Sequence, residues 1–516
     1  MVTKKDIINS FIELSKQYPE KRITRDFFVQ NTSIKYSDVV EHFNSFTDML
    51  RDIENDLKDI TKRSNNEFVV NNTNHKRFIV TSVVEVAPIN ENFLSALKSY
   101  CKINDAQLVI LWMKGTKKND SFLLATLHSL KPYLATNFRF SEKLRAMDFQ
   151  LSPQQMNPLM GLDRYGQKES SLIIAHTKQF MNSIPRPKGN IPHTIWSTGT
   201  ISEPFYSSTR VGSIASQDNK LGALVVEIGK PDRFWIRPVQ WINNQFVDLG
   251  IAYKPNMKTC KVKTKAMILG DLHIGEEDTD SLNTSIEQIN YFNPENTFIH
   301  DLCSLNSINH HEKNQYLARA SRKSFANMNL SAEMEYLANK MASIARQTKS
   351  TNTQFKIVHS NHDNFMDKWL NDGEFIKDKS NAELGAHCFI YSLQGKNPLE
   401  ELVNQRGEDP QMMKKFEFLQ EDQQYLVEGF DCGSHGHNGP NGASGTATNF
   451  ARTHMKAVIG HSHSPKIEFD TYQVGTNSKL DLGYNKGSSS WLHANCVIYE
   501  GGYIQMLTFI DKQWKL

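Results

Sequence analysis

The chain has 516 residues, of which 39% are hydrophobic and 10% aromatic, a composition that can form packed cores and excludes a largely disordered protein. The 59 Lys and Arg against 56 Asp and Glu give a formal net charge of +3, so bulk charge alone does not indicate a nucleic-acid partner. No long apolar run and no CxxC pair occur, and we expect a soluble cytoplasmic protein of about three domains with reduced thiols and no membrane contact.

Residues 1–65 are predicted to form short helices. In "ITRDFFVQNTSIKYSDVVEHFNSFTDML", Thr24 is the expected N-cap of one helix, a polar break follows at residues 31–33, and Ser37 is expected to open a second helix. This segment resembles the small helix-turn-helix repeat associated with homing endonucleases, and the resemblance implies DNA binding. The segment also carries 11 Lys and Arg against 11 Asp and Glu, so a helical packing or oligomerisation module is an equal alternative.

Residues 66–255 are expected to form an α/β accessory domain of unknown role. Apolar runs of strand length alternate with helical stretches, as in "RFIVTSVVEVA", "AQLVILWM", "SLIIAHT" and "GALVVEI". The segment "SIPRPKGNIPHTIWSTGTIS" places Arg186, Lys188 and His193 among prolines. We interpret it as a structural connection, with a binding loop as the alternative.

Residues 256–516 repeat a pattern of strand followed by polar cluster. The predicted strands are "AMILG", "TFIH", "FKIVHS" and "KAVIG". Between the second and third, Leu330, Met334, Leu337, Met341 and Ile344 recur at helical spacing, with Ser331 as the expected cap. Strands alternating with helices indicate a sheet covered by helices, and ligands of such sheets bind at the carboxyl ends of the strands.

The polar clusters after these strands share one chemistry, because all offer carboxylate, amide or imidazole ligands and none offers a thiolate. Such ligands suit Mn, Fe or Zn. The clusters are Asp271 and His273 in "GDLHIG", Asp301 in "FIHDL", Asn361, His362 and Asp363 in "VHSNHDN", His435 in "SHGHNG", and His461 and His463 in "IGHSHSP". Five clusters of one kind in about 200 residues favour a metal site over separate structural residues.

The ordered pattern DxH, D, NHD, H and GHxH is similar to that of the calcineurin-like metallophosphoesterase superfamily. The resemblance implies an α/β (α+β) sandwich of sheets with helices outside, and two divalent metal ions. One ion would be held by Asp271, His273 and His463. The other would be held by Asn361, His435 and His461, with Asp301 as the bridge. In this family pattern His362 would protonate the leaving oxygen or stabilise the charge of the pentacoordinate phosphorus, and Asp363 would orient a histidine.

Several positions depart from that pattern or leave it open. His300 and Ser360 stand where the family usually has glycine. His437 competes with His435 as the ligand from "SHGHNG", and His454 is a more distant alternative. His310 and His311 could reach the site, although a solvated helix start is the preferred interpretation. The glycines around His435 suggest either a loop that a bulky ligand approaches closely or a flexible turn, and the helix in the gap between Asp301 and Asn361 suggests a substrate-side wall or an oligomer contact.

The words around "SHGHNGPNGASGTATNF" and "LDLGYNKGSSSWLHANCVIY" resemble a phage-encoded branch of early DNases that attack host DNA. The resemblance implies a manganese-activated DNase in the host cytoplasm, with Fe²⁺, Zn²⁺ or Mg²⁺ as other possible cations. A nucleotide phosphodiesterase or phosphatase is the first alternative. A nonenzymatic DNA-binding factor with structural metals is the second. Polarity, strand preference and oligomeric state, including a homo-oligomer, stay open.

Overall fold

The computed structural model describes residues 2–19, 21–57, 69–70, 75–116, 120–168, 170–229, 233–312, 329–349, 353–453 and 456–516. The chain divides into two compact units. Unit 1 comprises residues 1–181, 193–260 and 516, and unit 2 comprises residues 182–192 and 261–515. The predicted boundaries at residues 65 and 255 stay predictions. Residues 52–66 are predicted to form a solvated helix end and linker, of which residues 58–66 lie outside the described residues.

Four helices open unit 1, namely α1 (Lys4–Gln17), α2 (Arg25–Asn31), α3 (Tyr36–Phe43) and α4 (Phe46–Asp56). Thr24 caps α2 as predicted, because its side chain accepts a hydrogen bond from the Phe27 N–H. Ser37 was wrongly expected to open the next helix. The N-cap of α3 is Lys35, whose backbone N–H is accepted by the Asp38 carboxylate at 2.9 Å.

Aromatic packing holds these helices together. The rings of Phe11, Phe28 and Phe46 lie 5.6–6.3 Å apart between centroids, and all three side chains are buried. The basic side chains here are partly neutralised locally, since Arg25 pairs with Asp26 at 2.7 Å and Arg51 with Asp48 at 2.8 Å. These contacts favour the packing role of the segment, and DNA binding by it stays a prediction.

The rest of unit 1 is mixed α/β. Strands β2, β3 and β4 are parallel, and β10 and β11 join the same sheet antiparallel, in the order β11-β10-β2-β3-β4. The remaining elements of unit 1 are β1 (Val69–Val70), β2 (Arg77–Val84), α6 (Glu91–Asn104), β3 (Ala106–Met113), α7 (Asp120–Leu130), β4 (Leu134–Ala135), β5 (Phe138–Ser141), β6 (Leu144–Met147), α8 (Asp163–Lys168), β7 (Ser171–Ile174), β9 (His193–Ser197), α9 (Arg210–Asp218), β10 (Gly222–Ile228), β11 (Phe234–Gln240), β12 (Phe246–Asp248), β13 (Ile251–Tyr253) and β14 (Thr259–Lys261).

Unit 2 is built on a six-stranded sheet with the order β18-β17-β16-β15-β24-β25. Its first four strands are parallel, so their carboxyl ends lie at one edge. They are β15 (Thr264–Leu269), β16 (Asn296–Ile299), β17 (Gln354–Ile357) and β18 (Phe416–Phe418), followed in the sheet by the antiparallel strands β24 (Ala494–Tyr499) and β25 (Tyr503–Thr508). The buried runs "AMIL" and "TFI" explain why these segments become central strands.

A second set of strands in unit 2 follows the order β8-β22-β23-β21-β20-β19. It meets the first sheet near Asp271, whose backbone N–H donates to the Gly475 carbonyl at 3.1 Å. These strands are β8 (Met181–Ile184), β19 (Leu426–Val427), β20 (Phe430–Asp431), β21 (Ala457–Ile459), β22 (Lys466–Glu468) and β23 (Thr471–Gln473). The prediction of a mixed α/β chain is confirmed.

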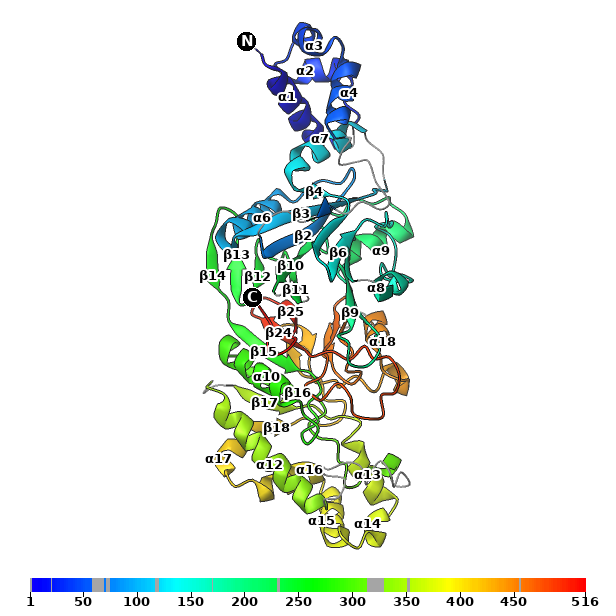
Figure 1. Ribbon diagram of the computed structural model, residues 1–516, viewed down its shortest axis with the longest axis vertical. Helices are drawn as coiled ribbons and strands as arrows, with labels where there is room; N and C mark the ends of the chain where they lie inside the picture. Colours follow the sequence, from blue (N-terminus) through cyan, green and yellow to red (C-terminus); the bar gives the residue numbers. More distant parts are fainter. Residues whose placement is uncertain are drawn as a thin grey trace. The chain divides into compact units, whose positions relative to one another are not determined.

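Helices cover the six-stranded sheet and extend beyond it (Figure 1). The predicted helix between the second and third strands is α12, but Ser331 was the wrong cap. Asn329 caps it two residues earlier by accepting a hydrogen bond from the Ala332 N–H. The described helices of unit 2 are α10 (Thr279–Phe292), α12 (Leu330–Gln347), α13 (Asn364–Asn371), α14 (Glu374–Lys377), α15 (Ala382–Leu393), α16 (Pro398–Arg406), α17 (Pro410–Met413) and α18 (Ala447–Arg452). The last of them, α18, packs on β22 and β23 of the second sheet.

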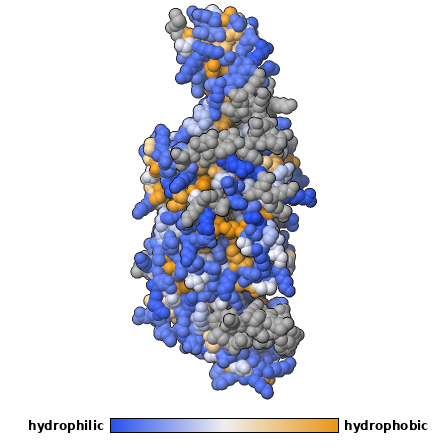
Figure 2. Space-filling model, in the orientation of Figure 1, coloured by the Kyte–Doolittle hydropathy of each residue, from blue (hydrophilic) through white to orange (hydrophobic). Residues whose placement is uncertain are grey.

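Among the described residues, no helix combines the length and apolar character needed to cross a membrane. The face drawn in Figure 2 is mostly hydrophilic outside its grey regions, with smaller hydrophobic groups between. All six cysteines are free thiols, as the scattered spacing predicts.

Candidate metal centre

The predicted ligands come together because five strands end beside one another. Strands β15, β16 and β17 are neighbours in register, so the residues that follow them meet at one edge. The residues after β20 and β21, strands that also pair in parallel, arrive from the second sheet. The side chains concerned are Asp271, His273, His300, Asp301, Asn361, His362, His435, His461 and His463.

Four of these side chains form a tight buried group. Ligand atoms of Asp271, His273, Asp301 and His463 all lie within 4.8 Å of one another. The Nε2 atom of His463 is 3.1 Å from Asp271 Oδ2 and 3.0 Å from His273 Nε2. Two carboxylates and two imidazoles that converge in this way could hold one divalent ion.

A second group shares a carboxylate with the first. Ligand atoms of Asp271, His300 and His435 also lie within 4.8 Å of one another. His435 Nε2 is 3.3 Å from Asp301 Oδ2, and that same oxygen is 3.4 Å from His273 Nε2. The carboxylate common to both groups is Asp271, and Asp301 of the first group also reaches His435 of the second, so both carboxylates lie where a bridging ligand has to be.

His300 was missed as a functional residue because sequence reasoning treated it only as a replaced glycine. Its side chain is fully buried, and its Nδ1 lies 3.2 Å from His435 Nδ1. Its other nitrogen, Nε2, has no hydrogen-bond partner among the described residues. The only signal in the sequence was its place directly before Asp301, at the end of a strand.

Asn361 and His461 form the outer part of the centre. The His461 Nδ1 atom and the Asn361 Oδ1 atom are 3.0 Å apart, and both residues are partly exposed. The His461 backbone N–H donates to Asp271 Oδ1 at 3.1 Å. The His461 ring lies 5.3 Å from the His435 ring, so this pair borders the second group.

Several ligand atoms of the site are buried without a hydrogen bond, as expected for a site that binds a divalent metal. Within the described part of the chain, Asp301 Oδ1 and His300 Nε2 are buried with neither a hydrogen bond nor an ion pair, and Asp271 Oδ2 and His435 Nε2 make no hydrogen bond and face only the other ligands, His463 and Asp301. An unpaired buried polar group costs about 1–3 kcal/mol, and unsatisfied atoms in a native structure call for an explanation such as a bound ion. Several such atoms converge here, and a cation would satisfy them together.

The backbone at the ligand positions is also strained. The φ angles of His273, Asp301, His461 and His463 are 46°, 42°, 75° and 59°, in the left-handed region that residues other than glycine rarely adopt. Each such residue costs about 1–3 kcal/mol, and strain of this kind gathers at functional sites. The turns after the strands therefore turn these side chains inward at a cost in stability.

Gly460 makes this close approach possible. A Cβ atom at this position would lie 2.3 Å from Asp271 Oδ1 and 2.9 Å from His300 Cγ, distances that no side chain tolerates. The glycine of "IGHSHSP" thus allows the loop carrying His461 and His463 to reach the carboxylate after β15.

Burial and mutual charge set the protonation of the centre. Burial lowers the pKa of His273 and of His300 to about 3, so both imidazoles are neutral at pH 7 and can offer a lone pair. Burial opposes ionisation of Asp301, but His435 and the neighbouring histidines hold the pKa of that carboxyl well below its usual range. Although burial lowers the pKa of His435, the nearby Asp301 raises it overall.

His362 and Asp363 take different places. His362 lines the pocket, and its Nδ1 lies 3.3 Å from the Ser304 carbonyl. Because a carbonyl oxygen can only accept a hydrogen bond, Nδ1 carries a hydrogen. Nε2 is therefore the ring nitrogen that can gain or lose a proton in the pocket. Asp363 does not line the pocket; it accepts a hydrogen bond from the Ser360 N–H at 2.8 Å and lies 3.9 Å from His359. Burial raises the pKa of Asp363.

Of the competing histidines, His435 lies at the centre. His437 has its ring 5.5 Å from that of His435 and 6.1 Å from that of His461, and it belongs to neither group of converging ligands. Burial lowers its pKa to about 4. His454 lies outside the described residues.

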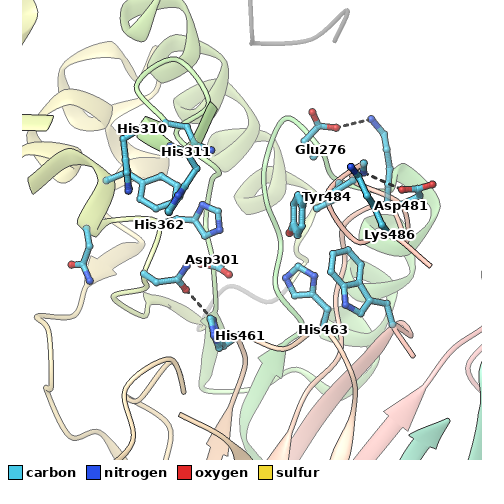
Figure 3. Close-up of a pocket in the computed structure, with 18 of the residues that line it drawn as sticks. Glu276, Asp301, His310, His311, His362, His461, His463, Asp481, Tyr484 and Lys486 are labelled. Atoms are coloured by element: carbon cyan, nitrogen blue, oxygen red, sulfur yellow. Dashed lines mark hydrogen bonds and ion pairs between the residues drawn. The ribbon is translucent and has the colours of Figure 1, made fainter. Parts of the chain in front are cut away.

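The centre forms the floor of a pocket of about 1320 Å³. In Figure 3, Asp301 and His461 lie at the floor, His310, His311 and His362 on one side, and Tyr484 and Lys486 on the other. His310 and His311 begin a short helical turn, as expected, and both also line the pocket. The described part of α12 contributes no residue to the pocket, so the prediction that it forms a substrate-side wall gains no support.

Two of the glycines around His435, Gly433 and Gly445, serve internal packing, whereas Gly429 and Gly442 have positive φ angles and open space around them. A Cβ on Gly445 would lie 1.9 Å from the Gly436 carbonyl oxygen, and one on Gly433 would lie 2.1 Å from the Gln423 carbonyl oxygen. These positions bring backbone against backbone inside the protein. Internal packing explains these two positions, and for the other glycines a close approach to a ligand and a flexible turn stay open.

Comparison with known proteins gives one informative relative. "Protein A1" of Escherichia phage T5 is 26% identical over 466 residues, which cover 84% of this chain and 82% of that protein. No family model matches the chain, and no solved structure matches it. The relative is compatible with a phage origin, but its name states no activity, so the function has to be argued from the site.

Proposed function

We propose that the protein is a metal-dependent nuclease that hydrolyses DNA phosphodiester bonds. The observation that carries the proposal is the set of buried carboxylates and imidazoles at the floor of the pocket, with donor atoms left unpaired. Two divalent cations, most simply Mn²⁺, match this mixture of oxygen and nitrogen donors. The ordered motifs that resemble calcineurin-like metallophosphoesterases, with their sandwich of sheets, support the same assignment.

Asp271, His273 and His463 would hold one cation, and Asn361, His435 and His461 the other, with Asp301 between them. Bound divalent cations supply Lewis acidity, a lowered pKa for water and charge neutralisation at the phosphate. The neutral imidazole of buried His273 and the ionised carboxyl of Asp301 are the protonation states that such binding needs. His435, whose pKa the nearby Asp301 raises, would give up its proton when a cation binds.

The protein's own groups would handle the leaving oxygen. His362 lies at the pocket with its Nδ1–H donated to the Ser304 carbonyl. It would therefore act as an imidazolium, whose Nε2–H would pass its proton to the departing alkoxide and leave the neutral ring with its hydrogen on Nδ1. Asp363 acts as a positioning residue, because its hydrogen bond to the Ser360 N–H closes the turn that carries Asn361 and His362.

A polynucleotide fits the pocket better than a small substrate does. Its volume of about 1320 Å³ exceeds the range of about 300–1,000 Å³ that is usual for small-molecule sites. Three lysines line it, namely Lys368, Lys479 and Lys486. With a relative from a phage, we propose host DNA as the substrate and the host cytoplasm as the place of action.

The first prediction concerns metal and the bridging carboxylate. The purified protein should degrade linear DNA in the presence of Mn²⁺, and EDTA or Asp301→Asn should abolish cleavage, because both remove cation binding between the two groups. The measurement is a time course on end-labelled single-stranded and double-stranded DNA across a series of metals. Asp280→Asn is a matched control, since Asp280 is exposed and pairs with Lys512 away from the pocket.

Two outcomes would replace this proposal. Cleavage of mononucleotide or chromogenic phosphoesters with DNA left intact would indicate a nucleotide phosphodiesterase or phosphatase. Bound metal without hydrolysis of any phosphoester would indicate a nonenzymatic role.

A further inference from the structure

A row of aromatic rings leads from the pocket rim to the metal centre. The Trp491 ring lies 4.2 Å from the ring of His463, and the Tyr484 ring lies 5.7 Å from that of Trp491. Both aromatic residues line the pocket, and Tyr484 is 56% exposed. Because the Tyr484 ring is exposed at the pocket wall, it adds little to the hydrophobic core and can contact a ligand in the pocket.

The segment that carries these rings, residues 479–491, is a fixed wall. Asn485 accepts a hydrogen bond from the Leu482 N–H at 3.1 Å and donates to the Leu480 carbonyl at 2.9 Å. Ser489 exchanges two backbone hydrogen bonds with Arg186, at 2.8 and 3.0 Å. Lys188 pairs with Asp481 at 2.6 Å. The proline-rich segment of the sequence thus holds this wall.

Lys486 adds a cation beside the exposed ring. The other two lysines of the pocket have acidic partners, since Lys479 pairs with Glu276 at 3.1 Å and Lys368 with Asp372 at 2.9 Å. Among the described residues, Lys486 has no acidic side chain within ion-pair distance, and it is exposed. Figure 3 shows it next to Tyr484 on the same side of the pocket.

We propose that residues 479–491 form a nucleotide-binding wall, on which Tyr484 stacks against an unpaired base next to the scissile bond and Lys486 binds a phosphate of the same strand. The proposal rests on the nuclease function and names its substrate class. An aromatic face together with a cation is how proteins bind single strands without sequence preference. Because a base inside a duplex has both faces covered by its neighbours, the wall favours single strands and frayed ends.

The test uses an end-labelled single-stranded DNA that carries one abasic nucleotide in its middle, with Mn²⁺ as the cation. The rate at which the wild-type protein cleaves a bond beside the abasic position should be about tenfold lower than at other bonds. The reason is that no base is present there to stack on Tyr484, and such a stack accelerates cleavage by about that factor. Bonds far from the abasic position serve as the internal control. Intact duplex of the same sequence should be cut more slowly than the single strand.

The variants separate stacking from damage to the metal centre. Tyr484→Ala should remove the discrimination against the abasic position and raise KM for the single strand about tenfold, whereas Tyr484→Phe keeps the ring and should keep both properties. Damage to the metal centre would slow every bond equally and leave the discrimination unchanged. Tyr165→Ala is a matched control, because Tyr165 is 51% exposed and does not line the pocket.

Lys486→Met should weaken single-strand binding and make it less dependent on salt, since one phosphate contact is lost. Lys377→Met is the matched control, because Lys377 is exposed and lies outside the pocket. It should leave single-strand binding and its salt dependence unchanged. Equal cleavage beside the abasic nucleotide and beside normal bases by the wild type, or unchanged discrimination in Tyr484→Ala, would overturn the inference while leaving the nuclease function intact. Failure of the wild type to cut any DNA would overturn both.

Discussion

At the scale of single residues, His435 and His437 are only two positions apart in the sequence but make different contacts. His435 is fully buried, with Nε2 facing Asp301 and Nδ1 facing His300. Both nitrogens of His437 are buried without a hydrogen-bond partner among the described residues, yet neither joins a group of converging ligands. The family resemblance favours His435, but the sequence left His437 as a near alternative because the two histidines are only two positions apart in "SHGHNG".

The two histidines should therefore behave differently on substitution. His435→Ala should lower metal affinity by about a hundredfold or more, because even partners that only support a ligand contribute 10–100-fold. His437→Ala should bind metal much as the wild type does. The measurement is isothermal titration with Mn²⁺ on protein that has been stripped of metal. Equal losses in both variants would contradict the assignment of His435 as the ligand.

At the scale of elements, the centre depends on how closely loops from two sheets approach. The loop after β21 reaches the end of β15 only because Gly460 lacks a side chain. Four ligand positions carry left-handed backbone, so each turn is held in place by the strands on either side. The pocket wall at residues 479–491 is likewise held by a segment from far away in the sequence, residues 186–188.

Gly460→Ala should therefore disturb the centre. The added methyl group would have to displace Asp271 or His300, and overpacking of this kind costs about 1–3 kcal/mol. We expect a lower free energy of unfolding and weaker metal binding, measured by urea denaturation and metal titration. Gly395→Ala is the control, because Gly395 has a φ of 71° and open space around it; it should lower stability without changing metal affinity.

At the scale of the whole molecule, the buried histidines link stability to pH and to metal. The pKa of His273 and His300 falls from 6.5 to about 3 on burial. Below pH 6.5 the unfolded chain takes up protons that the folded imidazoles do not accept, so folding is progressively disfavoured as the pH falls toward 3. His435 has the opposite sign, because its raised pKa stabilises the fold at low pH and that contribution is lost as the pH rises through its folded value.

Metal-depleted protein should thus lose stability as the pH falls from 7.5 to about 5, because the lowered histidines outnumber the raised one. Adding Mn²⁺ at a hundred times its dissociation constant should stabilise the fold by about 2.7 kcal/mol, and this gain should shrink at low pH as ligands take up protons. Urea denaturation at several pH values, with and without Mn²⁺, measures both effects. A free energy of unfolding that rises as the pH falls would contradict this prediction.

The sequence by itself determined the strands, the main helix and the chemistry of the polar clusters, because hydrophobic periodicity and residue type are local properties. It identified Asp271, His273, Asp301 and His463 without locating them relative to one another. Only the tertiary structure decided that His300 lies beside His435, that Asp363 lies behind a turn, and that the segment carrying Tyr484, Lys486 and Trp491 is held by Arg186 and Lys188. Those facts depend on contacts between segments up to about 300 residues apart, which no local pattern records.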